Sequence, residues 1–163
     1  MVGTAVQYLA QQPITVAILK DSNMNLNKDS FRYGVLYDGS SCADKVLAQT
    51  MLLMAANDRL TTITVVEPGM DKDAIKPRVE HIVGGSRPFD TVILTSEPNE
   101  TIKNCIKRYL KDQAADDDAH YVDFCAVGNR GLNKGNAVTG DDFLGTVARA
   151  MISMRKLNSI FVP

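Results

Sequence analysis

A glycine-rich stretch near the C-terminus has the residue types and the order that bind phosphate. An apolar run over residues 121–127 ends at Gly128, and a helical pattern begins at Gly145 and Thr146. Between them the loop carries three further glycines: Gly131, Gly135 and Gly140. Glycine lets a backbone approach an anion closely, and the start of a helix offers free N–H groups and the positive end of its dipole. The order of strand, glycine loop and helix start therefore predicts a phosphate-binding loop.

A second candidate is the Asp38-Gly39-Ser40 turn, which follows an apolar run over residues 31–37. These residue types favour a tight turn, and a serine there suits the N-cap of the helix that follows. Asp38 has two interpretations. Its carboxylate either contacts a ligand at the end of the strand or simply holds the turn and caps the helix.

The elements that position these two features alternate along the chain. Strands are predicted over 31–37, 61–67, 89–95, 121–127 and 159–162. Helices are predicted over 42–57, over 73–83 with Pro77 in the first turn, from Ser96-Glu97-Pro98 to about 114, and from Gly145 to about 154. This alternation predicts an α/β fold, a Rossmann-like, doubly wound, open five-stranded parallel sheet. Ligands of such sheets bind beyond the carboxyl ends of the strands at the switch point, so the two features should meet there.

The overall composition excludes several classes of protein. With 163 residues, a net charge of −1 and 45% hydrophobic residues, the chain is expected to be one ordinary globular domain. It shows no basic footprint for nucleic acid and neither a membrane span nor a signal peptide, so we expect a cytoplasmic protein without nucleic-acid or membrane partners. Cys42, Cys105 and Cys125 are widely spaced and are predicted to be buried thiols.

Catalytic and metal sites have little support in the sequence. His81 and His120 have no Ser, Cys or carboxylate partner at a recognisable spacing. The aspartates at 116–118 are expected to form a solvated turn, with a metal site as the alternative. The sequence contains neither a P-loop nor a nucleophile elbow. No catalytic and no metal-binding residues are therefore predicted, although slow ATP hydrolysis stays open.

Residues 31–163 resemble the universal stress protein family. The resemblance rests on VLYDGSS at the first strand, TVVEP at the second, AVGNRG at the fourth, GT followed by VARAMI at the last helix, and SIFVP at the end. Residues 1–30 lie outside it as an N-terminal extension, in which Ile14 to Leu19 is a candidate extra strand that either joins the sheet edge or lies across a dimer.

The resemblance implies the sheet order 3-2-1-4-5, a fold like that of the adenine nucleotide alpha hydrolases, and a homodimer paired through the C-terminal strand. It also implies binding of ATP or AMP, with Mg²⁺ as an optional companion. Asp38 would meet the adenine or ribose, Val65 would line the adenine pocket, and Val127 and Gly128 would face the ribose and first phosphate. The phosphates would meet the remaining residues of the site: Arg130, Gly131, Gly145, Thr146 and Val147.

The phosphate loop departs from the family pattern. Thirteen residues, 132–144, separate Gly131 from Gly145, where ATP-binding members have nine, and Asp141 and Asp142 add negative charge. A register that closes on Gly140 would replace the hydroxyl with a carboxylate, so Gly145-Thr146 is preferred. The sequence thus predicts a nucleotide-binding regulatory module of the stress response. The alternatives are a dimeric interaction module that does not bind nucleotide and a weak ATPase.

Overall fold

The computed structural model describes residues 13–20, 27–66, 69–115, 122–128, 145–154 and 157–163. The elements are, in chain order, β1 (Val16–Ile18), β2 (Arg32–Leu36), α2 (Ser41–Leu53), β3 (Arg59–Val66), the 3₁₀ helix η1 (Lys72–Ala74), α3 (Ile75–Val83), β4 (Phe89–Thr95), α4 (Ile102–Ala115), β5 (Phe124–Gly128), α5 (Thr146–Ser153) and β6 (Asn158–Val162). The short helix that contains Pro77 begins at Ile75, so the proline does lie in its first turn.

The described strands form one mixed sheet in the order β1-β6-β5-β2-β3-β4. Neighbours from β6 to β4 run parallel, whereas β1 runs antiparallel to β6, with Val16 opposite Phe161. The prediction of a five-stranded, wholly parallel sheet was therefore wrong, because the sheet has six strands and one is antiparallel. The sixth strand comes from the N-terminal extension, where Ile14 to Leu19 was a candidate strand.

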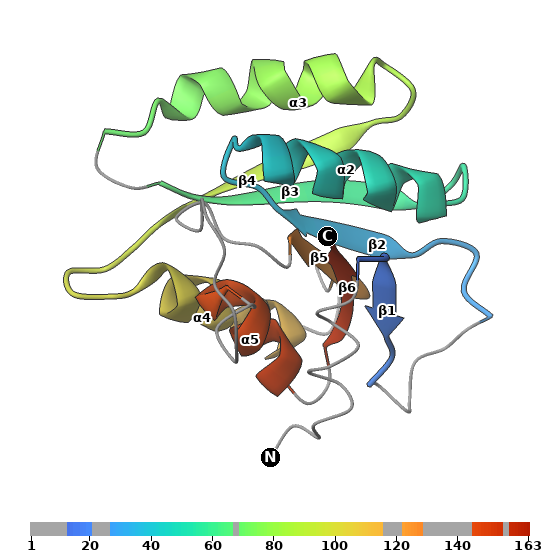
Figure 1. The fold of residues 1–163 in the computed structure, drawn as a ribbon. Coiled ribbons are helices and arrows are strands. Elements are labelled where there is room, and N and C mark those ends of the chain that lie inside the picture. Colours follow the sequence, from blue (N-terminus) through green and yellow to red (C-terminus); the bar gives the residue numbers. More distant parts are fainter. Residues whose placement is uncertain (1–12, 21–26, 67–68, 116–121, 129–144, 155–156) are drawn as a thin grey trace.

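Two layers of helix enclose the sheet, as Figure 1 shows. Alternate strand residues point to opposite faces, so neighbours such as Val35 and Leu36 enter different clusters. Val35 packs with residues of α2 and α3, and Leu36 packs with residues of α4 and α5. Strands covered on both faces need apolar side chains at nearly every position, which explains the continuous apolar runs in the sequence. Among the described residues no helix is long and apolar enough to cross a bilayer.

Two buried aspartates set boundaries that differ from the predicted ones. Asp58 accepts the N–H groups of Ala55 and Phe31, both at 2.8 Å, and α2 ends at Leu53 rather than near 57. Asp123 accepts the N–H of Arg32 at 2.8 Å, and β5 begins only after it, at Phe124. A carboxylate that accepts hydrogen bonds from backbone N–H groups competes with helix and strand formation. Each aspartate therefore lies outside the neighbouring helix or strand, and not in its interior.

Lys20 fastens the segment after β1 to the end of α5. Its Nζ donates to the carbonyl oxygens of Met151 (2.7 Å), Ile152 (3.2 Å) and Met154 (3.3 Å), and to Ser159 Oγ (3.3 Å). The last carbonyls of a helix lack partners within the helix and carry its negative end. Within the extension, the described residues 13–20 are thus packed onto the domain, even though burial lowers the pKa of Lys20 to about 8.

The three cysteines differ in exposure, and this gives a direct prediction. Cys105 and Cys125 are buried, as expected, whereas Cys42 is half-buried. Burial raises the pKa of Cys125 to about 12 and also raises that of Cys105. Because the thiolate is the reactive form, we expect a neutral-pH thiol reagent to modify Cys42 alone in the folded chain, and all three cysteines after unfolding. Mass spectrometry of the modified peptides checks this, and Cys42→Ser should leave no rapidly reacting thiol; rapid modification of Cys125 would contradict the prediction.

Candidate nucleotide site

The carboxyl ends of β2, β3 and β5 meet at the switch point of the sheet. β2 lies between β3 and β5, with Leu36 opposite Ile63 and Val35 opposite Ala126. Continuing these registers by two residues puts Asp38 beside Val65 and Tyr37 beside Gly128. The β2 crossover uses the α2 face and the β5 crossover uses the opposite face (Figure 1), so the two loops diverge here, which is the usual ligand position in open α/β sheets.

The Asp38 turn is closed by its own side chains. Asp38 Oδ1 accepts the N–H of Ser40 at 2.9 Å, and Ser40 Oγ accepts the N–H of Ala43 at 3.1 Å as the N-cap of α2. Gly39 has φ = +77°, a left-handed conformation that glycine adopts at little cost. Asp38 therefore holds the turn, as one of its two interpretations required. Its side chain is also exposed, so the carboxylate faces the solvent at the carboxyl edge.

A partly exposed polar network joins this turn to α2 and α3. Tyr37, directly before Asp38, donates its hydroxyl to Asp44 Oδ1 at 2.6 Å. Arg78 on α3 holds the same carboxylate with both Nε (3.1 Å) and Nη2 (2.5 Å). This bidentate pair lowers the pKa of Asp44, and burial together with the Asp44 bond raises that of Tyr37. The network fixes the end of β2 from which the turn starts.

Val65 and Val127 form part of the core beneath the site. They are 8% and 7% exposed and share one cluster with Leu36 on the face covered by α4 and α5. Their side chains can therefore offer only a small apolar surface at the carboxyl edge. Gly128 ends β5 opposite Val162 and is half-buried.

Helix α5 begins at Thr146, directly after Gly145. Gly145 is its N-cap, with φ = −59° and no side-chain cap bond, and its carbonyl accepts the first helical hydrogen bond, from Arg149 N–H at 3.0 Å. The N–H groups of the first helical turn have no acceptor within the helix. Thr146 is exposed, and Val147 is half-buried against the core. This helix start can therefore donate backbone N–H groups to an anion.

Part of the predicted site lies outside the described residues. Arg130, Gly131 and the insertion at 132–144 fall there, and so do the aspartates at 116–118 and His120. Of the predicted contacts, the described structure contains Asp38, Val65, Val127, Gly128, Gly145, Thr146 and Val147. Within the described ranges no group of three or more histidine, cysteine or carboxylate side chains could hold a metal ion.

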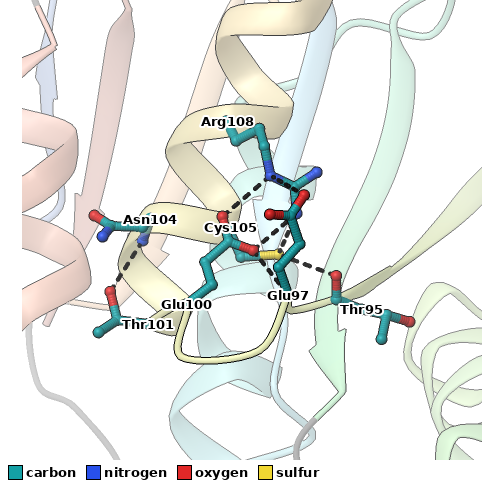
Figure 2. Close-up of polar contacts among 7 residues, drawn as sticks. All are labelled: Thr95, Glu97, Glu100, Thr101, Asn104, Cys105 and Arg108. Carbon is teal, nitrogen blue, oxygen red and sulfur yellow. Dashed lines mark hydrogen bonds and ion pairs between the residues drawn. The ribbon is translucent and has the colours of Figure 1, made fainter.

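The sequence interpretation missed a polar cluster at the end of β4 (Figure 2). Arg108 binds Glu100 through Nε (3.1 Å) and Nη2 (2.8 Å), and lies 3.8 Å from Glu97. Glu100 also accepts the N–H of Glu97 at 3.0 Å, which closes a turn with Asn99 at φ = +66°. The helix therefore begins at Ile102 and not at Ser96. In the sequence, the two glutamates near Pro98 could have indicated this cluster. Their partner Arg108, however, lies two helical turns beyond Glu100 along the chain.

The Glu100–Arg108 pair gives a prediction for acid unfolding. Arg108 holds the pKa of Glu100 down to about 2, well below its ordinary value of 4.5. The unfolded chain therefore binds the proton first as pH falls, so the pair's contribution is complete above about pH 4.5 and disappears toward pH 2. We expect Glu100→Gln to be less stable than the parent chain at pH 6, and the gap to shrink on acidification. Urea unfolding at several pH values measures it; a gap that does not change with pH would contradict the assignment.

Comparisons with known proteins agree with this geometry at the level of the fold. No family model matches the chain, and no curated protein matches it. Among solved structures, a universal stress protein in complex with cAMP matches with a TM-score of 0.57 and 20% sequence identity, covering 82% of this chain and 96% of that one. The chain therefore has the α/β fold of a universal stress protein.

Proposed function

We propose that this chain is a regulatory module that binds an adenine nucleotide at the switch point. The observation that carries the proposal is the start of α5, where the N-cap residue Gly145 makes no side-chain cap bond. This helix packs against β5, which is the neighbour of β2 in the sheet. A helix start without a side-chain cap is suited to hold a phosphate group. The structurally similar universal stress protein is described as a complex with cAMP, which supports an adenine nucleotide as the ligand.

The proposed residue roles are those that the resemblance to universal stress proteins implies. Gly145, Thr146 and Val147 donate backbone N–H groups, and the Thr146 hydroxyl donates as well, to the phosphates. Val127 and Gly128 face the ribose and first phosphate, Val65 lines the adenine pocket, and Asp38 accepts from the ribose or adenine. Arg130 and Gly131 complete the phosphate loop. ATP or AMP is the proposed ligand, with Mg²⁺ as a companion of the phosphates.

Nucleotide carried through purification tests this function. We expect denaturation of freshly purified chain to release adenine nucleotide, and calorimetric titration of the emptied chain with ATP, AMP and cAMP to rank the phosphate forms. GTP serves as the matched control, because it keeps the phosphates and changes the base. Absence of released nucleotide, together with absence of binding heat at millimolar concentrations, would overturn the proposal.

An interaction module without nucleotide is the second candidate. The observation that favours it is charge: Asp38 and Glu97 are exposed at the carboxyl edge, and Arg108, a cation at the same edge, is already bound by Glu100. Carboxylates near phosphates weaken binding by like-charge repulsion. The titration described above separates the two candidates. Phosphate release from ATP with and without Mg²⁺, measured against a no-protein background, tests weak ATPase activity.

Dimerisation through the C-terminal strand needs a changed geometry in this chain. A partner strand would have to pair with the outer edge of β6, and β1 pairs with that edge through Val16, Ala17 and Ile18. Lys20 and its bonds to the end of α5 hold the same segment in place. A β6-to-β6 dimer would therefore require displacement of β1. We propose that a homodimer in which β1 stays paired with β6 uses another surface.

A further inference from the structure

The opposite edge of the sheet is built differently from the edge at β6. Among the described strands, β4 pairs only with β3, over all seven of its residues from Phe89 to Thr95. Its outer backbone N–H and C=O groups therefore face away from the sheet. Proteins usually protect such an edge with a proline, a bulge or several charges. β4 contains no proline and a single charged residue, Asp90, and Ile93 in its second half is 41% exposed.

The charges at the two ends of β4 are opposite, with Glu97 exposed and Arg87 half-buried. Arg87, before the strand, donates Nη1 to Ala55 O at 3.3 Å, and its Nε–H has no partner among the described residues. Glu97, after the strand, has a side chain that is 69% exposed, and its only described ion pair is the 3.8 Å contact with Arg108. Arg108 is bound more closely by Glu100, at 2.8 Å.

These charges are complementary across a twofold axis. Consider two β4 strands paired antiparallel with Val92 of one copy opposite Val92 of the other. The numbers of any two residues that lie opposite each other then add up to 184. Arg87 then lies opposite the other copy's Glu97 at both ends, Ile93 lies opposite Thr91, and the two Asp90 side chains are kept apart opposite Leu94. Shifting the centre to residue 91 or 93 separates Arg87 from Glu97 and loses both ion pairs. We propose that β4 is a self-association edge that binds β4 of a second copy of this chain, antiparallel and centred on Val92.

This pairing extends one sheet across two chains and buries Ile93. Main-chain hydrogen bonds supply the attraction, and the two Arg87–Glu97 pairs set the direction and register. A single strand pair gives a small interface, so the dimer should be weak and dependent on concentration. The proposal does not depend on nucleotide binding, because α2 and the turn at Asp38 take no part in it.

The test is sedimentation velocity of the full chain from low to high micromolar concentration. We expect reversible dimerisation, weakened about tenfold or more by Ile93→Lys and by each single reversal, Arg87→Glu and Glu97→Arg. The double reversal restores opposite charges at both ends and should recover most of the lost affinity. Lys45→Glu is the matched control, since Lys45 is exposed on α2, which packs over β2, β5 and β6 and away from β4. Circular dichroism melting verifies that each variant is folded.

Hydrogen exchange locates the interface independently. Amide groups of residues 89–95 should exchange more slowly at high chain concentration, with no such change at β1 or β6. A chain that stays monomeric at every concentration overturns the proposal. So does a dimer that survives Ile93→Lys, that is not recovered by the double reversal, or that protects β1 and β6 instead of β4.

Discussion

Replacing Gly145 with aspartate is expected to lower adenine-nucleotide affinity at least about a hundredfold while leaving the fold intact. Gly145 is the N-cap of α5 and has φ = −59°, which any residue can adopt. An aspartate there would accept the free N–H groups of the first turn with its own carboxylate. It would thus occupy the donors that a phosphate needs and add a repelling charge. Loss of one or two charge-assisted hydrogen bonds, at about 1.5 to 3 kcal/mol each, accounts for this factor.

Two matched variants separate the causes of this loss. Gly145→Asn keeps the size and the capping oxygen but not the charge, so its affinity should lie between those of the parent and Gly145→Asp. Gly145→Ala removes no donor and should bind nearly normally. Calorimetric titration measures affinity, and thermal melting without nucleotide should show that Gly145→Asp is at least as stable as the parent. If a folded Gly145→Asp chain binds as tightly as the parent, the start of α5 does not contact phosphate.

Replacing Gly34 with alanine is expected to cost about 2 kcal/mol of unfolding free energy, although alanine normally suits a strand better than glycine. Gly34 lies in the middle of β2, opposite Thr61 and Cys125. A Cβ there would lie 2.9 Å from Val122 Cγ1 and 3.1 Å from Ile63 Cδ1. Val122 is 4% exposed and Ile63 is 1% exposed, so neither side chain can move aside freely. For a chain of this size the melting temperature should fall by about 4–8 °C.

A second substitution tests whether this contact is the cause. Val122→Ala removes the methyl groups that the new Cβ would meet, so the Gly34→Ala, Val122→Ala double variant should lose less stability than the two single variants added together. Urea unfolding of the four chains gives the coupling energy. Strict additivity would show that the contact with Val122 is not the cause of the loss. A Gly34→Ala chain as stable as the parent would show that the position does not require glycine.

Several elements could be predicted from local pattern alone. β4 has the predicted bounds, Phe89–Thr95, because it is an apolar run ended by Pro88 and by the polar turn that contains Pro98. The beginning of α5 after Gly145 and the turn at Asp38 were also predicted, since glycine and capping residues act within a few positions of themselves. The fold class followed from the alternation of these elements, and the structural match is at that level.

Other features depend on contacts made outside the element concerned. The end of α2 depends on Asp58, and the late start of α4 depends on Arg108, which reaches back to Glu100. β1 has only three residues, too few for a period to identify, and it forms a strand because β6 presents an unpaired edge to it. In each case a side-chain hydrogen bond or a strand ladder outweighs the local preference of the chain.

The candidate site shows the same division. The sequence by itself determined which residues can bind phosphate, because glycine conformations and helix-start donors are properties of short segments. The tertiary structure was needed to show that Val65 and Val127 lie in the core together with Leu36 of β2, and that among the described strands β1 pairs with β6 while β4 pairs only with β3. Those outcomes depend on which strands become neighbours, and strand neighbours are chosen by burial and backbone hydrogen bonding across the whole sheet.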